Sequence, residues 1–271
     1  MSKSSGSKIP KGAVVKIFTQ IKEINTQEPW NSTRTSGTGT GFIIKHDGKI
    51  LVITNHHVID NYSSIRVRLN ETIQKYKASV ITVNPVDDIA ILSFNDDNFD
   101  ENIITGIVYM ESNLQPILET EKYSVSVVGY PGGDQLSTTE GIVSRLCVQH
   151  RFRTGNREIR NYPDNIYDWD NRTSKIQISA AVNPGNSGGP VFNDEGICIG
   201  IASSHATNAQ NISYIIPCIL LNLMLKYLKN KTNSELISYY RKPCPGFNIQ
   251  GTEDDKLRKF YQIPEVFEGN N

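Results

Sequence analysis

The sequence predicts an all-β fold in which two six-stranded antiparallel β-barrels pack together and a helix follows them. Apolar residues come in short runs of about five or six, and β-branched residues dominate these runs. Gly, Asn, Asp and Pro separate the runs, as is typical of strands joined by turns. Two series of short strands with no helices between them favour two packed barrels over a sheet covered by helices.

The expected strands follow one another in two series. The first series forms barrel one, at about residues 13–115, with strands at Val14–Phe18, Thr40–Ile44, Ile50–Thr54, Ser64–Leu69, Ala78–Val83 and Ile89–Phe94. The second forms barrel two, at about 116–216, with strands at Ser124–Gly129, Gly141–Val148, Lys175–Ile178, Pro190–Phe192, Ile197–Ser203 and Ile212–Ile216. We expect the boundary between Asn113 and Tyr123, and a loop over Thr19–Thr35.

A helix is expected over Pro217–Lys229, where apolar residues recur at helical spacing and a proline stands at the start. The first twelve residues are rich in Ser, Lys and Gly and are expected to be flexible. Residues 242–271 suggest one strand and one short helix, too little to bury a core of their own. This tail is therefore expected to dock on the barrels or to stay mobile.

Composition excludes several classes of protein. The chain has 28 Lys and Arg against 28 Asp and Glu, so its net charge of zero gives no long-range attraction to nucleic acid or anionic membranes. It has no apolar run long enough for a transmembrane helix, and Met1–Gly12 lacks the apolar core of a secretory signal. Its four cysteines form no C-x-x-C pair. We therefore expect free thiols in an intracellular, cytoplasmic protein that is not secreted, with nucleus or virion as other locations.

The most informative string is Asn183–Pro190, which reads NPGNSGGP. A serine among glycines on a tight turn can present its hydroxyl, and the glycines let backbone N–H groups converge on one point. Such N–H groups could stabilise the oxyanion of a tetrahedral intermediate. By itself the string is also compatible with a glycine-rich surface turn.

The order of the candidate groups along the chain separates two kinds of hydrolase. The string also fits G-x-S-x-G, but an α/β-hydrolase places its acid and base after the serine, and only His205 follows Ser187. The order His, Asp, Ser on paired β-barrels is present instead. His56 and His57 end one apolar strand, and Asp87 and Asp88 begin another, so the residues alone leave two candidates for each role.

Several motifs in this order resemble those of the HtrA/Deg family of trypsin-like serine proteases, and in particular its eukaryotic, plant-type Deg group. The resemblance runs from about Gly12 to Lys229. It rests on Gly37–Phe42 (GTGTGF), Thr54–Val58 (TNHHV), Asp88–Leu92 (DIAIL), Val128–Gly133 (VGYPGG), Glu140–Arg145 (EGIVSR), Ala180–Pro190 (AAVNPGNSGGP) and Ile212–Pro217 (ISYIIP).

The resemblance implies a trypsin-like protease domain over residues 13–235 that hydrolyses peptide bonds through an acyl-enzyme. The family pattern T-N-x-H-V selects His57 as the base, and an acid directly before a hydrophobic-Ala pair selects Asp88. Ser187 is then the nucleophile, and the N–H groups of Gly185 and Ser187, with Asn186, form the oxyanion hole. No metal or cofactor is implied.

The resemblance also bears on substrates and partners. Unfolded or partly folded polypeptides are the implied substrates, and a trimer-based homo-oligomer is the implied assembly. Two alternatives remain: a latent, chaperone-like scaffold that binds peptides without cleaving them, and a protease dedicated to processing one partner.

Substrate specificity is expected to depend on residues just before the serine. In this fold they form the floor of the pocket for the residue preceding the scissile bond (P1), with part of a later strand as the opposite wall. The expected substrate-binding residues are Ser179, Ala180, Ala181, Val182, Ile201, Ala202 and Ser203. None of them is acidic, so we expect a small or medium apolar P1 residue.

Two segments depart from the family pattern. Residues 242–271 resemble the opening of a PDZ domain without the rest, so we interpret them as a PDZ remnant or a docking tail. The insert Cys147–Ser174 interleaves basic and aromatic residues, a pattern that could suggest RNA binding. Its acidic residues favour a solvated loop instead. Its position suggests that it contacts a neighbouring subunit or partner and controls the order of the oxyanion hole.

Overall fold

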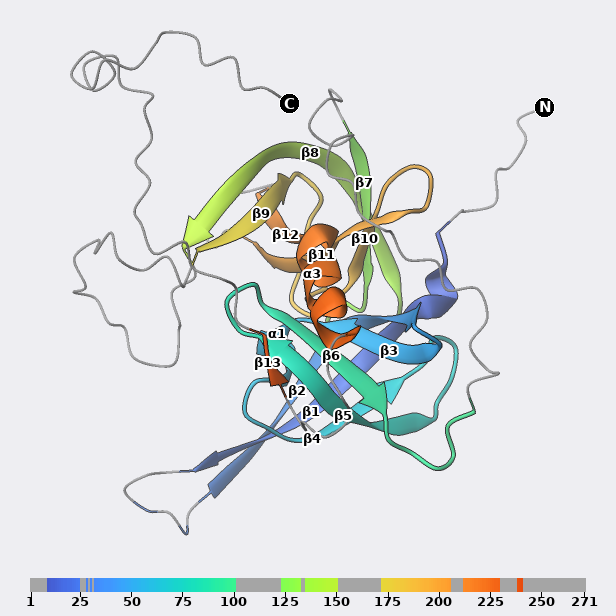
Figure 1. The fold of residues 1–271 in the computed structure, drawn as a ribbon, viewed down its shortest axis with the longest axis vertical. Helices are drawn as coiled ribbons and strands as arrows, with labels where there is room; N and C mark the ends of the chain where they lie inside the picture. Colours follow the sequence, from blue (N-terminus) through green and yellow to red (C-terminus); the bar gives the residue numbers. More distant parts are fainter. Residues whose placement is uncertain are drawn as a thin grey trace, which may run out of the picture.

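The computed structural model describes residues 9–24, 28, 30, 32–100, 123–132, 135–150, 172–205, 212–229 and 238–240. They form two β-barrels stacked one above the other, with one helix at their junction (Figure 1). The predicted fold class is confirmed. The expectations for residues 1–8, the linker around residue 113, the tail 242–271 and most of the insert lie outside the described residues.

The first barrel is a sheet whose strands follow the order β5-β4-β1-β2-β3-β6 and which closes through pairing of β5 with β6. Its strands are β1 (Val14–Ile24), β2 (Ser32–His46), β3 (Lys49–Thr54), β4 (Tyr62–Arg68), β5 (Lys75–Asn84) and β6 (Ile89–Phe94). A 3₁₀ turn, η1 (Lys11–Ala13), precedes it, and the short helix α1 (His56–Ile59) follows β3. The strand pairings within this barrel are antiparallel.

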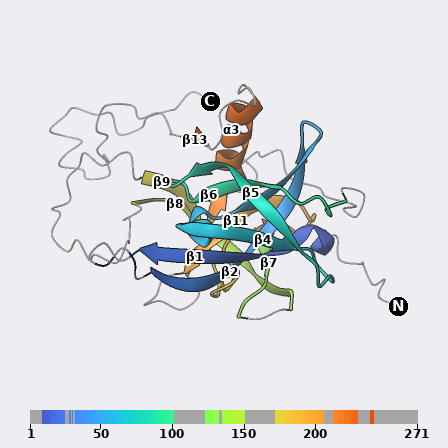
Figure 2. The same cartoon turned by 90° about the horizontal axis from the view of Figure 1, so that it is seen from below.

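The second barrel closes in the order β10-β11-β12-β9-β8-β7 and is also antiparallel. Its strands are β7 (Ser124–Gly129), β8 (Ser137–His150), β9 (Arg172–Ile178), β10 (Pro190–Phe192), β11 (Cys198–His205) and β12 (Ser213–Pro217). Helix α3 (Cys218–Lys229) follows directly, one residue later than the expected start at Pro217. Seen from below, α3 lies on the β5–β6 side of the first barrel, away from β1 and β2 (Figure 2).

Strands at the junction of the barrels are buried on both faces. In β2, Ile43 points into the core of the first barrel, whereas its neighbours Phe42 and Ile44 pack against the second barrel and α3. The same alternation occurs in β3, where Val52 faces the barrel and Leu51 and Ile53 face the junction. This explains why these strands are continuous apolar runs rather than alternating ones. The shared cluster also locks the two barrels together.

Several elements differ from the expectations. The expected loop Thr19–Thr35 is mostly an antiparallel hairpin, because β1 and β2 pair in register from Val14–Phe42 to Ile24–Ser32. Strands β8 and β9 extend into the expected insert, and Gln149 still pairs with Thr173. The residues that these extensions add are mostly polar, so they carry no apolar pattern that the sequence could reveal. Helix α1 and the two-residue strand β13 (Ser238–Tyr239), which pairs in parallel with β5, were not expected.

Two of the four cysteines lie in the described core. Cys198 on β11 and Cys218 at the start of α3 are free thiols whose sulfur atoms are 3.8 Å apart. The hydrogen bond with Cys198, together with burial, raises the pKa of the Cys218 thiol well above its usual value. Both thiols therefore act as small apolar groups that pack α3 onto the barrel.

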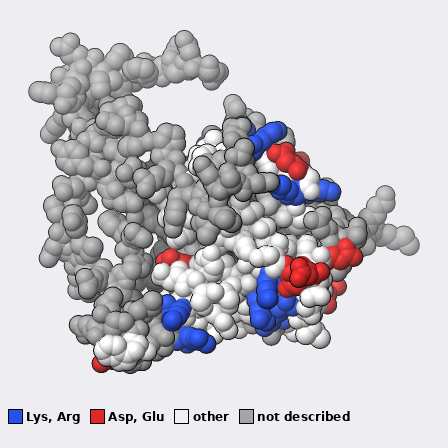
Figure 3. All heavy atoms as spheres, turned by 60° about the horizontal axis from the view of Figure 1, so that its bottom comes forward, with Lys and Arg blue, Asp and Glu red and all other residues white. Residues whose placement is uncertain are grey.

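The surface carries both signs of charge. On the face shown in Figure 3, the basic and acidic side chains of the described residues lie beside one another rather than in one continuous field. Within the described ranges, no helix combines the length and apolar character that crossing a membrane requires.

Two leucines of α3, one buried and one exposed, provide a matched test of how this helix packs against the barrels. Leu221 is 1% exposed in the core between the barrels, whereas Leu223, two residues later, is 41% exposed. We expect Leu221→Ala to lower the free energy of unfolding by about 2–5 kcal/mol, because it removes buried contacts and leaves a cavity. Leu223→Ala should change it by less than about 0.5 kcal/mol. Urea unfolding measures both, and equal effects would show that α3 does not dock by this face.

Candidate active site

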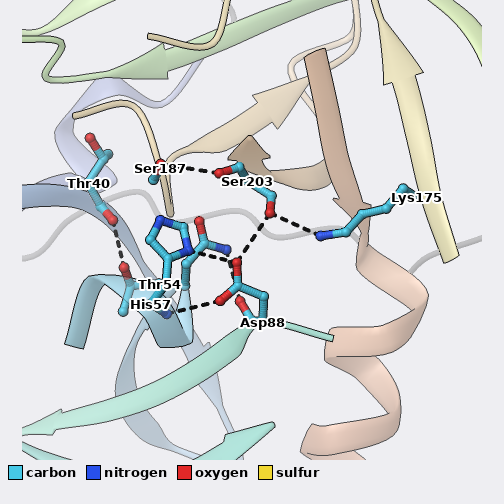
Figure 4. Close-up of polar contacts among 8 residues, drawn as sticks. Thr40, Thr54, His57, Asp88, Lys175, Ser187 and Ser203 are labelled. Carbon is cyan, nitrogen blue, oxygen red and sulfur yellow. Dashed lines mark hydrogen bonds and ion pairs between the residues drawn. The ribbon is translucent and has the colours of Figure 1, made fainter. Parts of the chain in front are cut away.

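Three segments that are distant in sequence meet where the barrels join (Figure 4). His57 lies in α1 after β3, Asp88 ends the turn between β5 and β6, and Ser187 lies in the loop between β9 and β10. The first two come from the first barrel and the third from the second. The imidazole of His57 lies between Asp88 and Ser187.

Asp88 and His57 form a tightly bonded pair. The Nδ1 atom of His57 is 2.7 Å from Oδ2 of Asp88, and the backbone N–H of His57 donates to Oδ1 at 3.0 Å. The Asp88 side chain is 5% exposed and the His57 side chain 42%. An ionised carboxylate only accepts, so Nδ1 carries the hydrogen and Nε2 keeps a free lone pair. The buried acid thereby orients an imidazole that remains open to solvent.

The backbone of Asp88 adopts a conformation that non-glycine residues rarely take. Its φ is +63°, in the left-handed region, which costs on the order of 1–3 kcal/mol. Its carbonyl accepts hydrogen bonds from the side chain of Asn55 at 2.9 Å and from the N–H of His56 at 3.2 Å. These contacts hold the residue in place, so the start of α1 and the residue before it position both the acid and the base.

The Ser187 hydroxyl faces a different acceptor. Among the described residues it has one hydrogen-bond partner, the carbonyl oxygen of Ser203 on β11, at 3.3 Å. Catalytic hydrogen bonds are often long or misaligned in a free enzyme. Rotation about the Cα–Cβ bond of Ser187 is the change needed to move this hydroxyl from Ser203 towards the imidazole.

Two glycines shape the loop around Ser187. Gly185 has φ +101°, and a Cβ there would lie 2.3 Å from the carbonyl oxygen of Tyr130. Gly188 has φ +85°, and a Cβ there would lie 2.2 Å from the carbonyl oxygen of Thr40. Both positions therefore require glycine for conformation and for space.

Next to the nucleophile, the backbone N–H groups of Gly185 and Ser187 have no hydrogen-bond partner among the described residues. The carbonyl of Pro184 accepts from the N–H of Gly132 at 3.1 Å. The C=O and N–H of one trans peptide point in opposite directions, so the N–H of Gly185 points away from Gly132. The N–H of Asn186 is engaged, since it donates to the carbonyl of Asn183 at 2.9 Å.

Thr40 on β2 attaches this loop to the first barrel, and each of its polar groups forms a hydrogen bond. Its hydroxyl donates to the carbonyl of Gly185 at 2.6 Å and accepts from the N–H of Tyr130 at 3.0 Å. Its N–H donates to the carbonyl of Ser187 at 2.9 Å, and its carbonyl accepts from the hydroxyl of Thr54 at 2.8 Å. Thr40 therefore sets the position of the loop from outside it.

Tyr130 gives this junction a second anchor. Its hydroxyl bonds to Oδ1 of Asn70 at 3.1 Å and to the carbonyl of Val14 at 3.5 Å. Burial raises the pKa of Tyr130 to about 12, so the phenol stays protonated at neutral pH and can donate.

The residues expected to bind substrate are near the site, but several point elsewhere. The side chains of Ala180, Val182 and Ala202 lie in the core of the second barrel, and Ile201 packs at the junction. Ser179 accepts a hydrogen bond from the N–H of Ile142 at 2.9 Å, Ala181 is exposed, and Ser203 donates to Asp88 at 3.2 Å. The buried members of this set have only their backbone available to line a pocket.

Comparison with known proteins identifies the fold and the family. A family model for the trypsin-like peptidase domain matches residues 39–201, which is more than half of the chain and spans the segments of His57, Asp88 and Ser187. The chain belongs to the trypsin-like peptidase family. In fold, this trypsin-like chain is similar to an HtrA-type protease, AlgW, solved with a decapeptide, with a TM-score of 0.60, 21% identity, and coverage of 81% of this chain and 64% of that one.

Curated relatives confirm the resemblance to the HtrA/Deg group. The chloroplastic Protease Do-like 2 of Arabidopsis thaliana is 34% identical over 93% of this chain and 37% of its own length. A probable periplasmic serine endoprotease, DegP-like, of Marinomonas sp. (strain MWYL1) is 35% identical over 79% of this chain and 40% of its own length. The trypsin-like chain thus spans about two fifths of each of these relatives.

The expectation of a cytoplasmic location is contradicted by these relatives, whose names place them in the chloroplast and the periplasm. The expectation depended on the missing apolar run in Met1–Gly12. That reasoning tests only for a secretory signal, because chloroplast and mitochondrial transit peptides are amphipathic and rich in Ser and Arg rather than apolar.

Sequence reasoning did not identify three residues whose contacts support the site. Thr40 stands in the GTGTGF motif, but nothing in that string shows that its hydroxyl reaches Gly185. Lys175 begins an ordinary-looking expected strand and Thr173 falls in the expected insert, yet they contact Ser203 and Asp87. Among the described residues, no three His, Cys, Asp or Glu side chains are grouped to bind a metal ion.

The hydroxyl of Thr40 can be tested with two substitutions of similar size. Thr40→Val keeps the shape but leaves the carbonyl of Gly185 and the N–H of Tyr130 without their partner, so we expect a loss of about 1–3 kcal/mol in the free energy of unfolding. Thr40→Ser keeps the hydroxyl and should cost about 1 kcal/mol or less. Urea unfolding compares them, and equal stability would contradict the proposed anchoring.

Proposed function

We propose that the chain is a serine endopeptidase in which Ser187 is the nucleophile, His57 the general base and Asp88 the acid that orients His57. The N–H groups of Gly185 and Ser187 form the oxyanion hole, and Asn186 contributes to the shape of the loop rather than a donor. The observation that carries this proposal is the 2.7 Å bond from Asp88 to Nδ1 of His57, which leaves Nε2 free on the side of Ser187.

The reaction proceeds in two halves. Ser187 Oγ attacks the peptide carbonyl carbon while its proton moves to Nε2 of His57, and the negative charge develops on the carbonyl oxygen. The C–N bond then breaks and the proton passes from His57 to the leaving amine, which leaves an acyl-enzyme on Ser187. Water attacks this ester with His57 as base again, and the proton returns to Ser187 as the acid product leaves.

Unfolded or partly folded polypeptides are the proposed substrates, in line with the Do-like and DegP-like names of the relatives. The half-exposed imidazole supports this, because a segment of chain can reach it without passing through the core. Processing of a single partner is the narrower alternative, which a profile of cleavage sites separates from general degradation. Assembly into a trimer stays a prediction from the family resemblance.

A latent scaffold is the second candidate, favoured by the Ser187 hydroxyl bonding to Ser203 instead of His57. In that state the chain would bind polypeptide without cleaving it until a partner turns the hydroxyl towards the base.

Labelling with a fluorophosphonate probe and degradation of casein test the enzyme. We expect the wild-type chain to label and to degrade casein, because His57 activates Ser187. Ser187→Ala and His57→Ala should each lower kcat on the order of 10⁶-fold, since the members of such a triad act as a unit. Labelling of neither the wild type nor the variants would contradict an active protease and support the latent scaffold.

The P1 preference provides an independent prediction. None of the residues expected before Ser187 or on β11 carries a carboxylate that could pair with Lys or Arg. We therefore expect cleavage after Val, Ile, Ala or Leu in a peptide library, with kcat/KM for these exceeding that for Lys or Arg at least about tenfold. A preference for basic P1 residues would contradict this pocket.

A further inference from the structure

A buried lysine of the second barrel binds Ser203, the serine that supports the acid of the site. Lys175 lies on β9 and is 5% exposed, and its Nζ atom donates to the Ser203 hydroxyl at 3.0 Å. Figure 4 shows its side chain directed from β9 towards Ser203 and Asp88. Burial of an ammonium is costly unless the charge is compensated.

The chemistry of the two groups sets the direction of the hydrogen bonds. An ammonium has three donors and no acceptor, so the oxygen of Ser203 must accept from Lys175. The single hydrogen of that hydroxyl is then free for Oδ2 of Asp88, at 3.2 Å. The same Oδ2 accepts from Nδ1 of His57 at 2.7 Å. A directed chain of hydrogen bonds thus runs from Lys175 through Ser203 and Asp88 to His57.

Two buried carboxylates close to Ser203 explain why a cation is favoured at the position of Lys175. Asp87 and Asp88 are adjacent carboxylates with exposures of 1% and 3%. Thr173, two residues before Lys175 on the same strand, donates to Oδ1 of Asp87 at 2.7 Å. One face of β9 therefore brings a hydroxyl to Asp87 and, through Ser203, a positive charge to the side of Asp88.

We infer that Lys175 is a positioning residue for catalysis, which acts through Ser203 to keep the carboxylate of Asp88 aimed at Nδ1 of His57. This inference rests on the proposed protease function. Lys175 touches neither the scissile bond nor the nucleophile; it fixes which atom of Ser203 faces the acid, and so stabilises the tautomer of His57 that accepts the serine proton.

Steady-state kinetics on a peptide substrate test this role. Lys175→Met keeps the length of the side chain and removes the charge and the donors. We expect kcat to fall about 10- to 100-fold, the range for one lost hydrogen bond to a charged group, with KM within about twofold of wild type. Lys175→Arg keeps the charge and donors and should recover part of kcat. Lys16→Met, at another buried lysine, is the control and should leave kcat unchanged.

A double-mutant cycle shows whether Lys175 acts through Ser203. Once Ser203→Ala has removed the relay, adding Lys175→Met should change kcat less than about threefold. If the two substitutions lowered kcat by factors that multiply in the double variant, the relay through Ser203 would be refuted. An unchanged kcat in Lys175→Met would refute the positioning role itself. Should Lys175→Met not fold, Lys175→Gln is measured in its place. A wild-type chain without activity or probe labelling would instead refute the protease proposal, so the two failures are distinct.

Discussion

The buried carboxylate of Asp88 is the group on which the rest of the site depends. It lies at the junction of the two barrels and accepts from the backbone and ring of His57 on one side and from Ser203 on the other. A buried charge is tolerated only when its oxygens are satisfied, so both barrels must dock in one arrangement. The apolar cluster at the junction supplies the driving force for docking, and the hydrogen bonds of Asp88 select the geometry.

The loop of Ser187, on the second barrel, is held in turn by contacts with the first barrel. Its glycines have conformations and close contacts that other residues cannot adopt, which leaves the loop little freedom. Thr40 then joins the loop to β2 through the carbonyls of Gly185 and Ser187. Each barrel therefore positions a catalytic segment of the other: β2 holds the serine loop, and β11 with β9 supports the acid.

This reciprocal support gives the site a physical route to regulation. The Ser187 hydroxyl rests on the Ser203 carbonyl, while the hydroxyl of Ser203 serves Asp88. A small shift of β11 changes both contacts at once. Strand β9, which carries Lys175 and Thr173, begins at Arg172, inside the expected insert, so the end of the insert belongs to the strand that supports the acid.

The sequence by itself determined the fold class, the order of the strands and the three segments that meet in the site. Short β-branched runs mark strands, and the strings around His57, Asp88 and Ser187 carry their chemistry in local spacing. It could not reveal the polar hairpin of β1 and β2, because backbone pairing needs no apolar pattern. Nor could it show that Thr40 binds the serine loop, that Ser203 binds the acid or that Lys175 binds Ser203. The contacts of Thr40 with Gly185 and of Ser203 with Asp88 join residues 145 and 115 positions apart on opposite barrels, so they exist only once the barrels have docked. The contact of Lys175 with Ser203 joins two strands of the second barrel and forms when that barrel closes.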